Sequence, residues 1–153
     1  MNKPKNTMKV TFPSRGANEG LARMLIAAFI TEADPTVEEL CDIKTAVSEA
    51  VTNCIVHAYP DRIGEIYIAA ALSENDLLTV KVRDRGCGIA DVQKAMEPLF
   101  TTGGSERAGL GFAVLQEVMD EVRVTSRVGG GTTVRLRRRL SQKSRYKSEL
   151  HSC

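Results

Sequence analysis

The sequence predicts an α+β fold: a two-layer sandwich in which a mainly antiparallel sheet carries its helices on one face. The first observation is the order of the patterns, which is strand, two helices, two strands, loop, helix, two strands. Strands that follow one another directly favour antiparallel pairing. The second is size and composition, because 153 residues with 42% hydrophobic and 26% charged side chains suit one domain with a real core. We expect that domain to span residues 1–140, followed by a polar tail over 141–153.

The first strand and helix are predicted from alternation and helical spacing. Residues 8–13 alternate apolar and polar side chains and end on a proline, which indicates an edge strand. Residues 19–33 follow as a helix, and Arg23 lies off its apolar stripe, so we expect the guanidinium to be exposed. The predicted stripe consists of Leu21, Met24, Leu25, Ala28 and Phe29.

The second helix is predicted over residues 37–58, where Thr36 and Glu39 form a capping-box pattern. Glu49 and Asn53 lie one turn apart on the flank of its apolar stripe, so they share a helix face. A carboxylate can accept a proton and an amide oxygen can ligate Mg²⁺. The pair therefore suits a pocket wall, although an ordinary solvated helix face has the same spacing.

Two further strands, over residues 65–72 and 77–83, are joined by a hairpin loop and followed by an Asp-x-Gly-x-Gly motif. Glycines at Gly86 and Gly88 allow a ligand to approach the backbone closely. Asp84 at the strand end can accept a hydrogen bond from an exocyclic amine such as that of adenine. A tight turn with a solvated aspartate is the alternative interpretation.

Residues 97–109 lack a clear period and contain three glycines, which indicates a loop. The helix expected over 109–120 opens with Gly109, Leu110 and Gly111, whose free backbone N–H groups could hold phosphate. Arg107 supplies a suitable charge beside them. The chain has neither a P-loop motif nor the catalytic loop of ordinary protein kinases.

Two strands over residues 122–128 and 132–140 close the predicted fold, and cations gather at its C-terminal end. The net charge is only +2, and without interleaved aromatic residues we expect no direct contact with nucleic acid. No secretory signal and no run of about 20 apolar residues is present, which predicts no membrane contact. Four cysteines without metal-ligand spacing indicate reduced thiols in a cytoplasmic protein.

Taken together, these motifs resemble the GHKL (Bergerat-fold) ATP-binding family over nearly the whole chain. That family pairs Glu-x-x-x-Asn on a helix with Asp-x-Gly-x-Gly after a strand and with a loop that ends in Gly-x-Gly before a helix. Local stretches such as SEAVTNCIVHAY, PLFTT, SERAGLGF and GGTTVRL are closer still to the SpoIIAB-type family of sporulation anti-sigma factors and serine kinases. RsbW-like stress-response kinases are the nearest alternative.

The resemblance implies a protein that inhibits a sporulation sigma factor of the sigma F type and uses Mg²⁺ and ATP to phosphorylate a serine of an anti-anti-sigma STAS-domain protein. It implies Asn53 as the Mg²⁺ ligand and Glu49 as the general base toward that serine. Asp84 would recognise the adenine, and Gly86 and Gly88 would shape the pocket around it.

Further implied roles concern the loop and the partners. Arg107 would contact the γ-phosphate, and an ATP lid would run from Thr101 and Thr102 to Gly111, with Gly103-Gly104 as a departure from the family pattern. The resemblance further implies Thr132 beside the base, Arg23 as a partner contact, and a homodimer.

Two other functions stay open at this stage, namely a histidine-kinase catalytic domain and a non-catalytic module that binds partners only with ATP. The first needs an upstream phosphoacceptor histidine, and none precedes His57. The second has no use for a general base such as Glu49. His57 and Cys87 we expect to be an ordinary boundary residue and an unreactive thiol.

Overall fold

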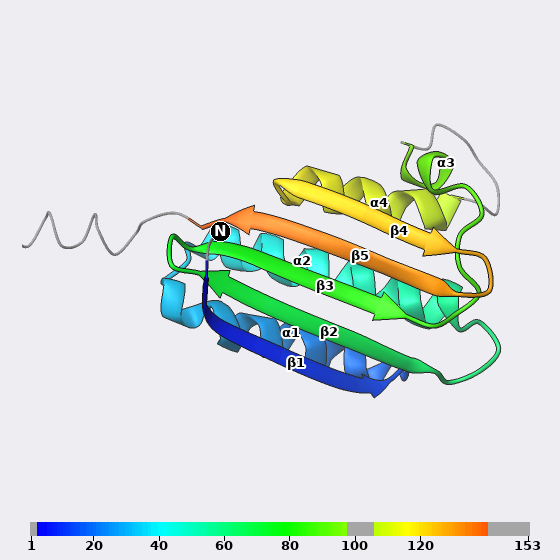
Figure 1. The fold of residues 1–153 in the computed structure, drawn as a ribbon, viewed down its shortest axis with the longest axis horizontal. Coiled ribbons are helices and arrows are strands. Elements are labelled where there is room, and N and C mark those ends of the chain that lie inside the picture. Colours follow the sequence, from blue (N-terminus) through cyan, green and yellow to red (C-terminus); the bar gives the residue numbers. More distant parts are fainter. Residues whose placement is uncertain (1–2, 98–105, 141–153) are drawn as a thin grey trace, which may run out of the picture.

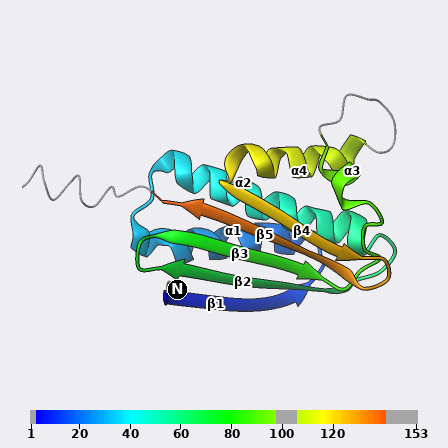
Figure 2. The ribbon, with the colours of Figure 1, turned by 45° about the horizontal axis from the view of Figure 1, so that its top comes forward.

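A computed structural model describes residues 3–97 and 106–140, with only the backbone described for 106–110. One five-stranded sheet forms one layer, and the long helices lie together on one of its faces (Figures 1 and 2). The predicted α+β sandwich is therefore confirmed. The elements are β1 (Pro4–Pro13), α1 (Ala17–Ile30), η1 (Thr31–Ala33), α2 (Val37–Asn53), η2 (Cys54–Ala58), β2 (Glu65–Ser73), β3 (Leu77–Asp84), α3 (Val92–Met96), α4 (Glu106–Val118), β4 (Glu121–Arg127) and β5 (Gly131–Arg139).

The sheet runs in the order β1-β2-β3-β5-β4, and every neighbouring pair is antiparallel. Each strand was expected within one or two residues of its observed ends except β1, which begins at Pro4 instead of residue 8. The extra residues pair with the far end of β2, as far as Ser73. β1 is an edge strand, as its terminal proline predicted.

The core lies between the sheet and the helices and is built almost wholly from aliphatic side chains. Strands β2, β3 and β5 contribute their inward-facing residues, and α2 lies behind them in Figure 1 as the central helix, in contact with α1 and α4. The most deeply buried large side chains are Ile26, Ile30, Ile43, Ile66, Leu72, Leu78, Leu115, Leu136, Val47, Val51, Val80 and Val82.

The predicted stripe on α1 was largely wrong. Met24 is 72% exposed and Leu21 is 42% exposed, whereas Ala22 and Ile26 are buried. The run from residue 21 to residue 30 is apolar at every position except Arg23, so more than one helical stripe fits the pattern. The buried face of α1 consists of Ala22, Ile26, Phe29 and Ile30, and the helix packs against α2.

Helix α2 begins as the capping box predicted, with Thr36 accepting from the Glu39 amide and the Glu39 carboxylate accepting from the Thr36 amide. Its last turn is not α-helical. Residues Cys54–Ala58 form a π-helical turn, in which the Tyr59 amide donates to the Cys54 carbonyl. Such turns widen a helix locally and are frequent at functional sites.

Helix α4 begins at Glu106, three residues before the predicted start. Gly109, Leu110 and Gly111 therefore lie inside the helix and do not precede it, which corrects the expected helix N-terminus at Gly109. Glutamate, arginine and alanine at positions 106–108 are good helix formers and extend the helix backwards past the glycines. No helix among the described residues is both long and apolar enough to cross a membrane.

Candidate functional site

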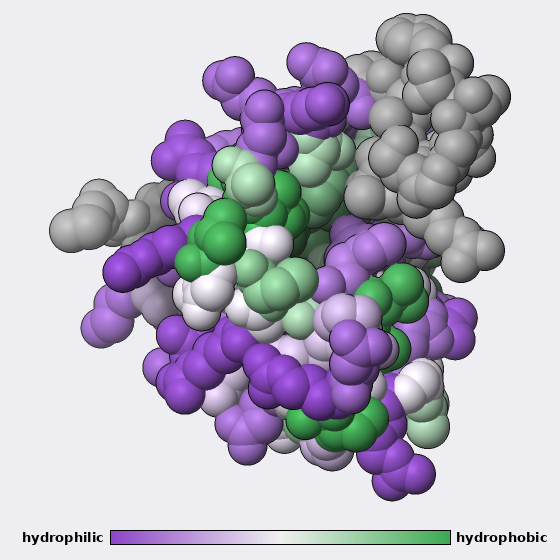
Figure 3. All heavy atoms as spheres, turned by 90° about the vertical axis from the view of Figure 1, so that its right-hand side faces the viewer, coloured by the Kyte–Doolittle hydropathy of each residue, from purple (hydrophilic) through white to green (hydrophobic). Residues whose placement is uncertain are grey.

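A partly enclosed cavity lies where the C-terminal end of α2 meets the end of β3, α3, α4 and the start of β5. It measures about 130 Å³, close to the roughly 150 Å³ at which apolar protein cavities bind a small aromatic ring. Seen from this end of the molecule, apolar side chains gather in the middle of a mostly hydrophilic face (Figure 3). The lining residues are Ala50, Asn53, Cys54, His57, Ala58, Asp84, Gly88, Ile89, Ala95, Phe112, Thr132 and Val134.

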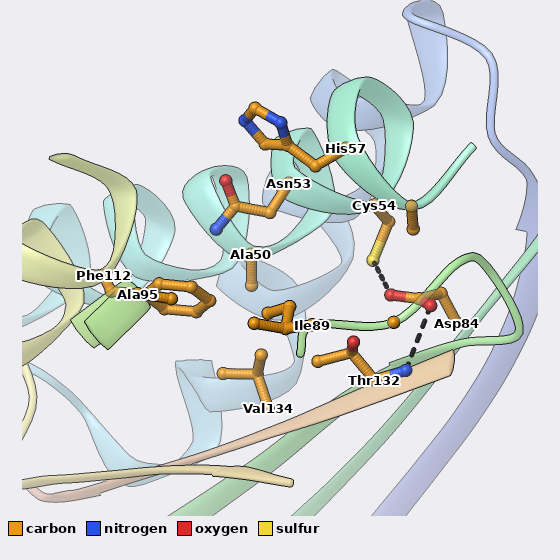
Figure 4. A pocket seen from close by; sticks show the side chains of 12 residues that line it. Ala50, Asn53, Cys54, His57, Asp84, Ile89, Ala95, Phe112, Thr132 and Val134 are labelled. Atoms are coloured by element: carbon orange, nitrogen blue, oxygen red, sulfur yellow. Dashed lines mark hydrogen bonds between the residues drawn. The ribbon is translucent and has the colours of Figure 1, made fainter. Parts of the chain in front are cut away.

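Asp84 is the buried acid of this cavity, with only 5% of its surface exposed. Its Oδ1 accepts hydrogen bonds from the Gly86 amide at 2.9 Å and from the Thr132 amide at 3.1 Å. Its Oδ2 is approached at 3.5 Å by the Cys54 thiol (Figure 4). The carboxylate is thus held from both sides, and the weak thiol donor leaves Oδ2 with capacity for a stronger donor.

Cys54 is a second polar group on the cavity wall that sequence reasoning missed, since in the helix pattern it is simply one of the apolar positions. Burial, followed by the negative charge of Asp84, raises the pKa of this thiol far above its usual range. The thiol therefore stays protonated and can only donate to the carboxylate. Cys54, Cys41 and Cys87 are all free thiols, as expected.

The Asp84–Gly88 loop fits its surroundings so closely that glycine is required at two positions. A Cβ on Gly86 would lie 2.3 Å from the Ala58 carbonyl oxygen, at the end of the π-helical turn. Gly88 has a φ of +78°, and a Cβ there would lie 2.1 Å from the Arg127 carbonyl oxygen. The loop is therefore packed between η2 and the β4–β5 turn, which places Asp84 against the cavity.

Asn53 occupies the opposite wall of the cavity, near α4 (Figure 4). Its Nδ2 is buried and has no hydrogen-bond partner among the described residues. A Cβ on Gly111 would lie 3.0 Å from both Oδ1 and Nδ2 of Asn53, so α4 approaches the amide closely because it has a glycine there. A buried amide without a partner costs free energy, which a bound ligand would recover.

The structure also describes three other predicted residues. Thr132 is buried beside Asp84 and lines the cavity, with its Oγ1 2.7 Å from Ser126 Oγ. Glu49 is half-buried one turn before Asn53 but does not itself line the cavity. Arg23 is exposed on α1, and its Nε lies 3.1 Å from the Glu19 carboxylate.

The predictions for the lid fall mainly outside the described residues. Thr101 and Thr102 belong to that undescribed part, as do Gly103 and Gly104. Arg107, Gly109 and Leu110 lie in the first turns of α4, but nothing is described of their side chains. Gly111 lies beyond the first four N–H groups, which are the ones that a helix start leaves free.

Several lining residues were not predicted. His57 lies exposed at the cavity rim, in the π-helical turn, and had been expected to be an ordinary boundary residue. Ile89, Phe112 and Val134 form apolar walls, contributed by three segments that are far apart in the sequence. Their apolar character was the only available signal, and it is shared with every core position.

The chemistry of this site suits a nucleotide. A partly open slot with apolar walls suits the flat face of an aromatic base, and the buried carboxylate at its end can accept a hydrogen bond from an exocyclic amine. No group of three or more His, Cys, Asp or Glu side chains that could hold a metal ion is present among the described residues. A single amide oxygen suits Mg²⁺ that is bound mainly through phosphate oxygens.

Comparison with known proteins agrees with this chemistry. The sequence model of the histidine kinase-like ATPase domain family matches residues 12–138. An anti-sigma F factor from Caldanaerobacter subterraneus subsp. tengcongensis is 55% identical over 132 residues, which cover 86% of this chain and 92% of that protein. The chain belongs to the anti-sigma F factor family. Another member, from Heyndrickxia coagulans, is 44% identical over 92% of this chain and 97% of its own length.

Among solved structures, the fold resembles that of the RsbU and RsbW domains of Rv1364c from Mycobacterium tuberculosis, with a TM-score of 0.67. The identity is 24%, and the match covers 90% of this chain and 33% of that longer one. At this identity the likeness supports the fold alone. The predicted SpoIIAB-type GHKL family is thus confirmed, and ATP use follows from the ATPase domain.

Proposed function

We propose that this anti-sigma factor is a protein serine kinase: it binds a sigma factor of the sigma F type and, with Mg²⁺ and ATP, phosphorylates a serine of an anti-anti-sigma STAS-domain protein. The observation that carries the proposal is the pairing, in one cavity, of a buried acid with a buried amide nitrogen that lacks a partner among the described residues. Asp84 Oδ2 and the Asn53 amide lie on opposite walls of a slot lined by apolar side chains.

The base of the nucleotide would lie in the apolar slot beside Ile89 and Val134, with its exocyclic amine donating to Asp84. Thr132 would support this contact, because its amide already holds the other carboxylate oxygen. Only a base with a donor at that position would satisfy the acid, and the exocyclic amine of adenine supplies one. A base that presents a carbonyl there would leave Asp84 Oδ2 with only the weak Cys54 thiol donor.

The triphosphate would extend toward α2 and the start of α4. The Asn53 amide oxygen would ligate Mg²⁺, which neutralises phosphate charge when bound. The free N–H groups at the start of α4, together with Arg107, would hold the terminal phosphate. Gly111 would keep α4 close enough to Asn53 for both elements to contact the same group.

Glu49 would act one turn away from Asn53, where the incoming serine hydroxyl arrives. Its carboxylate would accept the hydroxyl proton as the serine oxygen attacks the γ-phosphorus and ADP leaves. Arg23 lies exposed on α1, and we propose it as a partner contact. Homodimerisation and a cytoplasmic location complete the proposal.

The kinase proposal is tested by incubating the full chain with radiolabelled Mg-ATP and a purified STAS-domain antagonist. We expect acid-stable phosphoserine on the antagonist. Glu49→Gln should lower the transfer rate by about 10²–10⁴-fold, the usual contribution of a general base, while ATP affinity stays unchanged. Glu38→Gln removes an exposed carboxylate in the first turn of the same helix and should leave transfer at the wild-type rate.

Three results would contradict this proposal in different ways. Acid-labile phosphate would indicate histidine chemistry in place of serine chemistry. Intact sigma-factor binding without any transfer would leave a binding module that uses ATP only for assembly. Loss of ATP binding in Glu49→Gln would remove the general-base assignment, because the glutamate would then be needed for the nucleotide itself.

A further inference from the structure

The face of the sheet opposite the helices is strongly basic. It faces the viewer in Figure 1, and no described helix covers it. Three rows of side chains point outward across all five strands, and six of the side chains in them are cationic and one is anionic. The rows are Lys9-Ala69-Lys81-Arg135-Arg123, Thr11-Tyr67-Arg83-Thr133-Thr125 and Thr7-Ala71-Thr79-Arg137-Glu121. We call this surface the open face.

The positive charge of the open face is poorly compensated. Lys81 lies directly opposite Arg135, and Arg135 lies directly opposite Arg123. Like charges in such pairs destabilise a sheet. The carboxylate of Glu121 is shared among three guanidinium groups, at 2.8 Å from Arg135 and 3.7 Å from both Arg123 and Arg137.

Several cationic groups on the open face lack an acidic partner or keep an unused N–H donor among the described residues. Lys9, Lys81 and Arg83 form no ion pair there, and the buried Nε atoms of Arg135 and Arg137 have no hydrogen-bond partner. Repelling charges and unused hydrogen-bond donors both lower the free energy of unfolding of the sheet. An external anion would offset both terms.

The open face is also hollowed along β2. Lys9 and Lys81 border two adjoining depressions in which Ala69 lies, and Ala71 continues the floor. The small alanine side chains leave a shallow groove between β1 and β3. Strands are about 4.8 Å apart, so the two lysines stand roughly 10 Å from each other across the groove. That width admits one extended chain.

The chemistry of the face selects among possible occupants. A second copy of the same face would bring cation against cation. Nucleic acid that binds to a sheet stacks its bases on free aromatic rings, but the ring of Tyr67, the aromatic residue in the three rows, is already covered by Arg83 at 4.6 Å and Arg85 at 5.1 Å. No large exposed apolar side chain lies in the three rows to enter a lipid surface.

We propose that the open face binds an acidic segment of a partner protein, extended along β2, with its carboxylates against Lys9, Lys81 and Arg135. The proposal does not depend on ATP chemistry, since the face lies on the opposite side of the sheet from α2. It assigns a second interaction surface to the chain, separate from the nucleotide site and from Arg23 on α1.

The probe for this proposal is a peptide of eight glutamates, titrated into the isotopically labelled full chain at about 50 mM salt, where surface charges are weakly screened. We expect amide chemical-shift changes centred on Ala69 and its neighbours in β1 and β3. Lys81→Glu should weaken binding by about fivefold or more. Arg15→Glu makes the same charge change on an exposed loop residue and should leave affinity within about twofold.

A stability measurement gives an independent readout. Lys81→Gln removes a charge from a repelling pair, so we expect the melting temperature at low salt to rise by about 1–4 °C while peptide binding weakens. Shifts that map to the helices or to residues 141–153 would overturn the proposal. So would tighter binding of an oligonucleotide of equal charge, or a change of oligomeric state in Lys81→Glu.

Discussion

Replacing Gly111 by alanine should affect nucleotide binding much more than folding stability. Stability depends on the backbone and packing of α4, whereas binding depends on the position of the Asn53 amide. In the interior of α4, alanine is favoured over glycine by about 0.8–1.0 kcal/mol of helix propensity. Against this, the new Cβ would lie 3.0 Å from both polar atoms of the Asn53 amide. The amide must then shift, and a side chain displaced from its rotamer costs about 0.5–1.5 kcal/mol.

The two terms nearly cancel, so the free energy of unfolding should change by less than about 1 kcal/mol. For a chain of this size that corresponds to a shift of at most about 4 °C in the melting temperature without nucleotide. Binding of Mg-ATP should respond far more strongly. Loss of one contact from Asn53 to a charged group, worth about 1.5–3 kcal/mol, weakens affinity by roughly 10–150-fold.

The assay is thermal denaturation of the free protein together with calorimetric titration of Mg-ATP. Gly20→Ala is the matched control, because it lies in α1, where the nearest atom to the new Cβ is Arg23 Nη2 at 3.8 Å. It should keep wild-type affinity. Wild-type affinity in Gly111→Ala would refute the placement of Asn53 at the phosphates. A melting temperature lowered by more than about 10 °C would show damage to the fold instead.

Three further predictions concern the base end of the cavity and the open face. Asp84→Asn should weaken ATP binding at least tenfold by calorimetry, since an amide nitrogen cannot accept the bonds that the carboxylate accepts. Gly88→Ala should lower the melting temperature much more than Gly129→Ala: both have φ near +78°, at +78° and +77°, but only the first Cβ meets a backbone oxygen, at 2.1 Å. Equal losses would contradict that reasoning. The hydrogen bond from Arg135 lowers the pKa of Glu121, so its contribution to stability is present above about pH 4.3 and is lost as the pH falls through the lowered pKa. In thermal denaturation at decreasing pH, the melting temperature of Glu121→Gln should approach that of the wild type. A difference in melting temperature that stays constant with pH would contradict this reasoning.

Much of the fold was predictable because local signals agreed with the tertiary structure. The Thr36 capping box set the start of α2, and alternation set β2 and β3 to within a residue or two. Failure came where the local signal was degenerate. On α1 almost every position is apolar, so burial of Ala22 in place of Met24 depended on close packing against other elements.

The site was predictable only where its residues belong to short motifs. Asn53, Asp84 and Gly88 were named from spacing and meet in one cavity. Phe112 and Val134 complete that cavity, but as isolated apolar residues they cannot be told from core positions before the fold brings them together. The buried amide of Asn53 without a partner has no sequence signal, because it depends on the approach of α4.

Backbone hydrogen bonds hold the loop after Asp84 on two sides, one to η2 and one to the turn between β4 and β5. The Cys87 amide donates to the Ala58 carbonyl at 3.2 Å, and the Cys87 carbonyl accepts from the Gly129 amide at 2.8 Å. A recognition loop that is already ordered loses little conformational entropy when a ligand arrives. If the proposed adenine contact is correct, the arrangement that discriminates between bases exists before binding. The ratio of affinities for an adenine nucleotide and another nucleotide should then be the same for diphosphates and triphosphates.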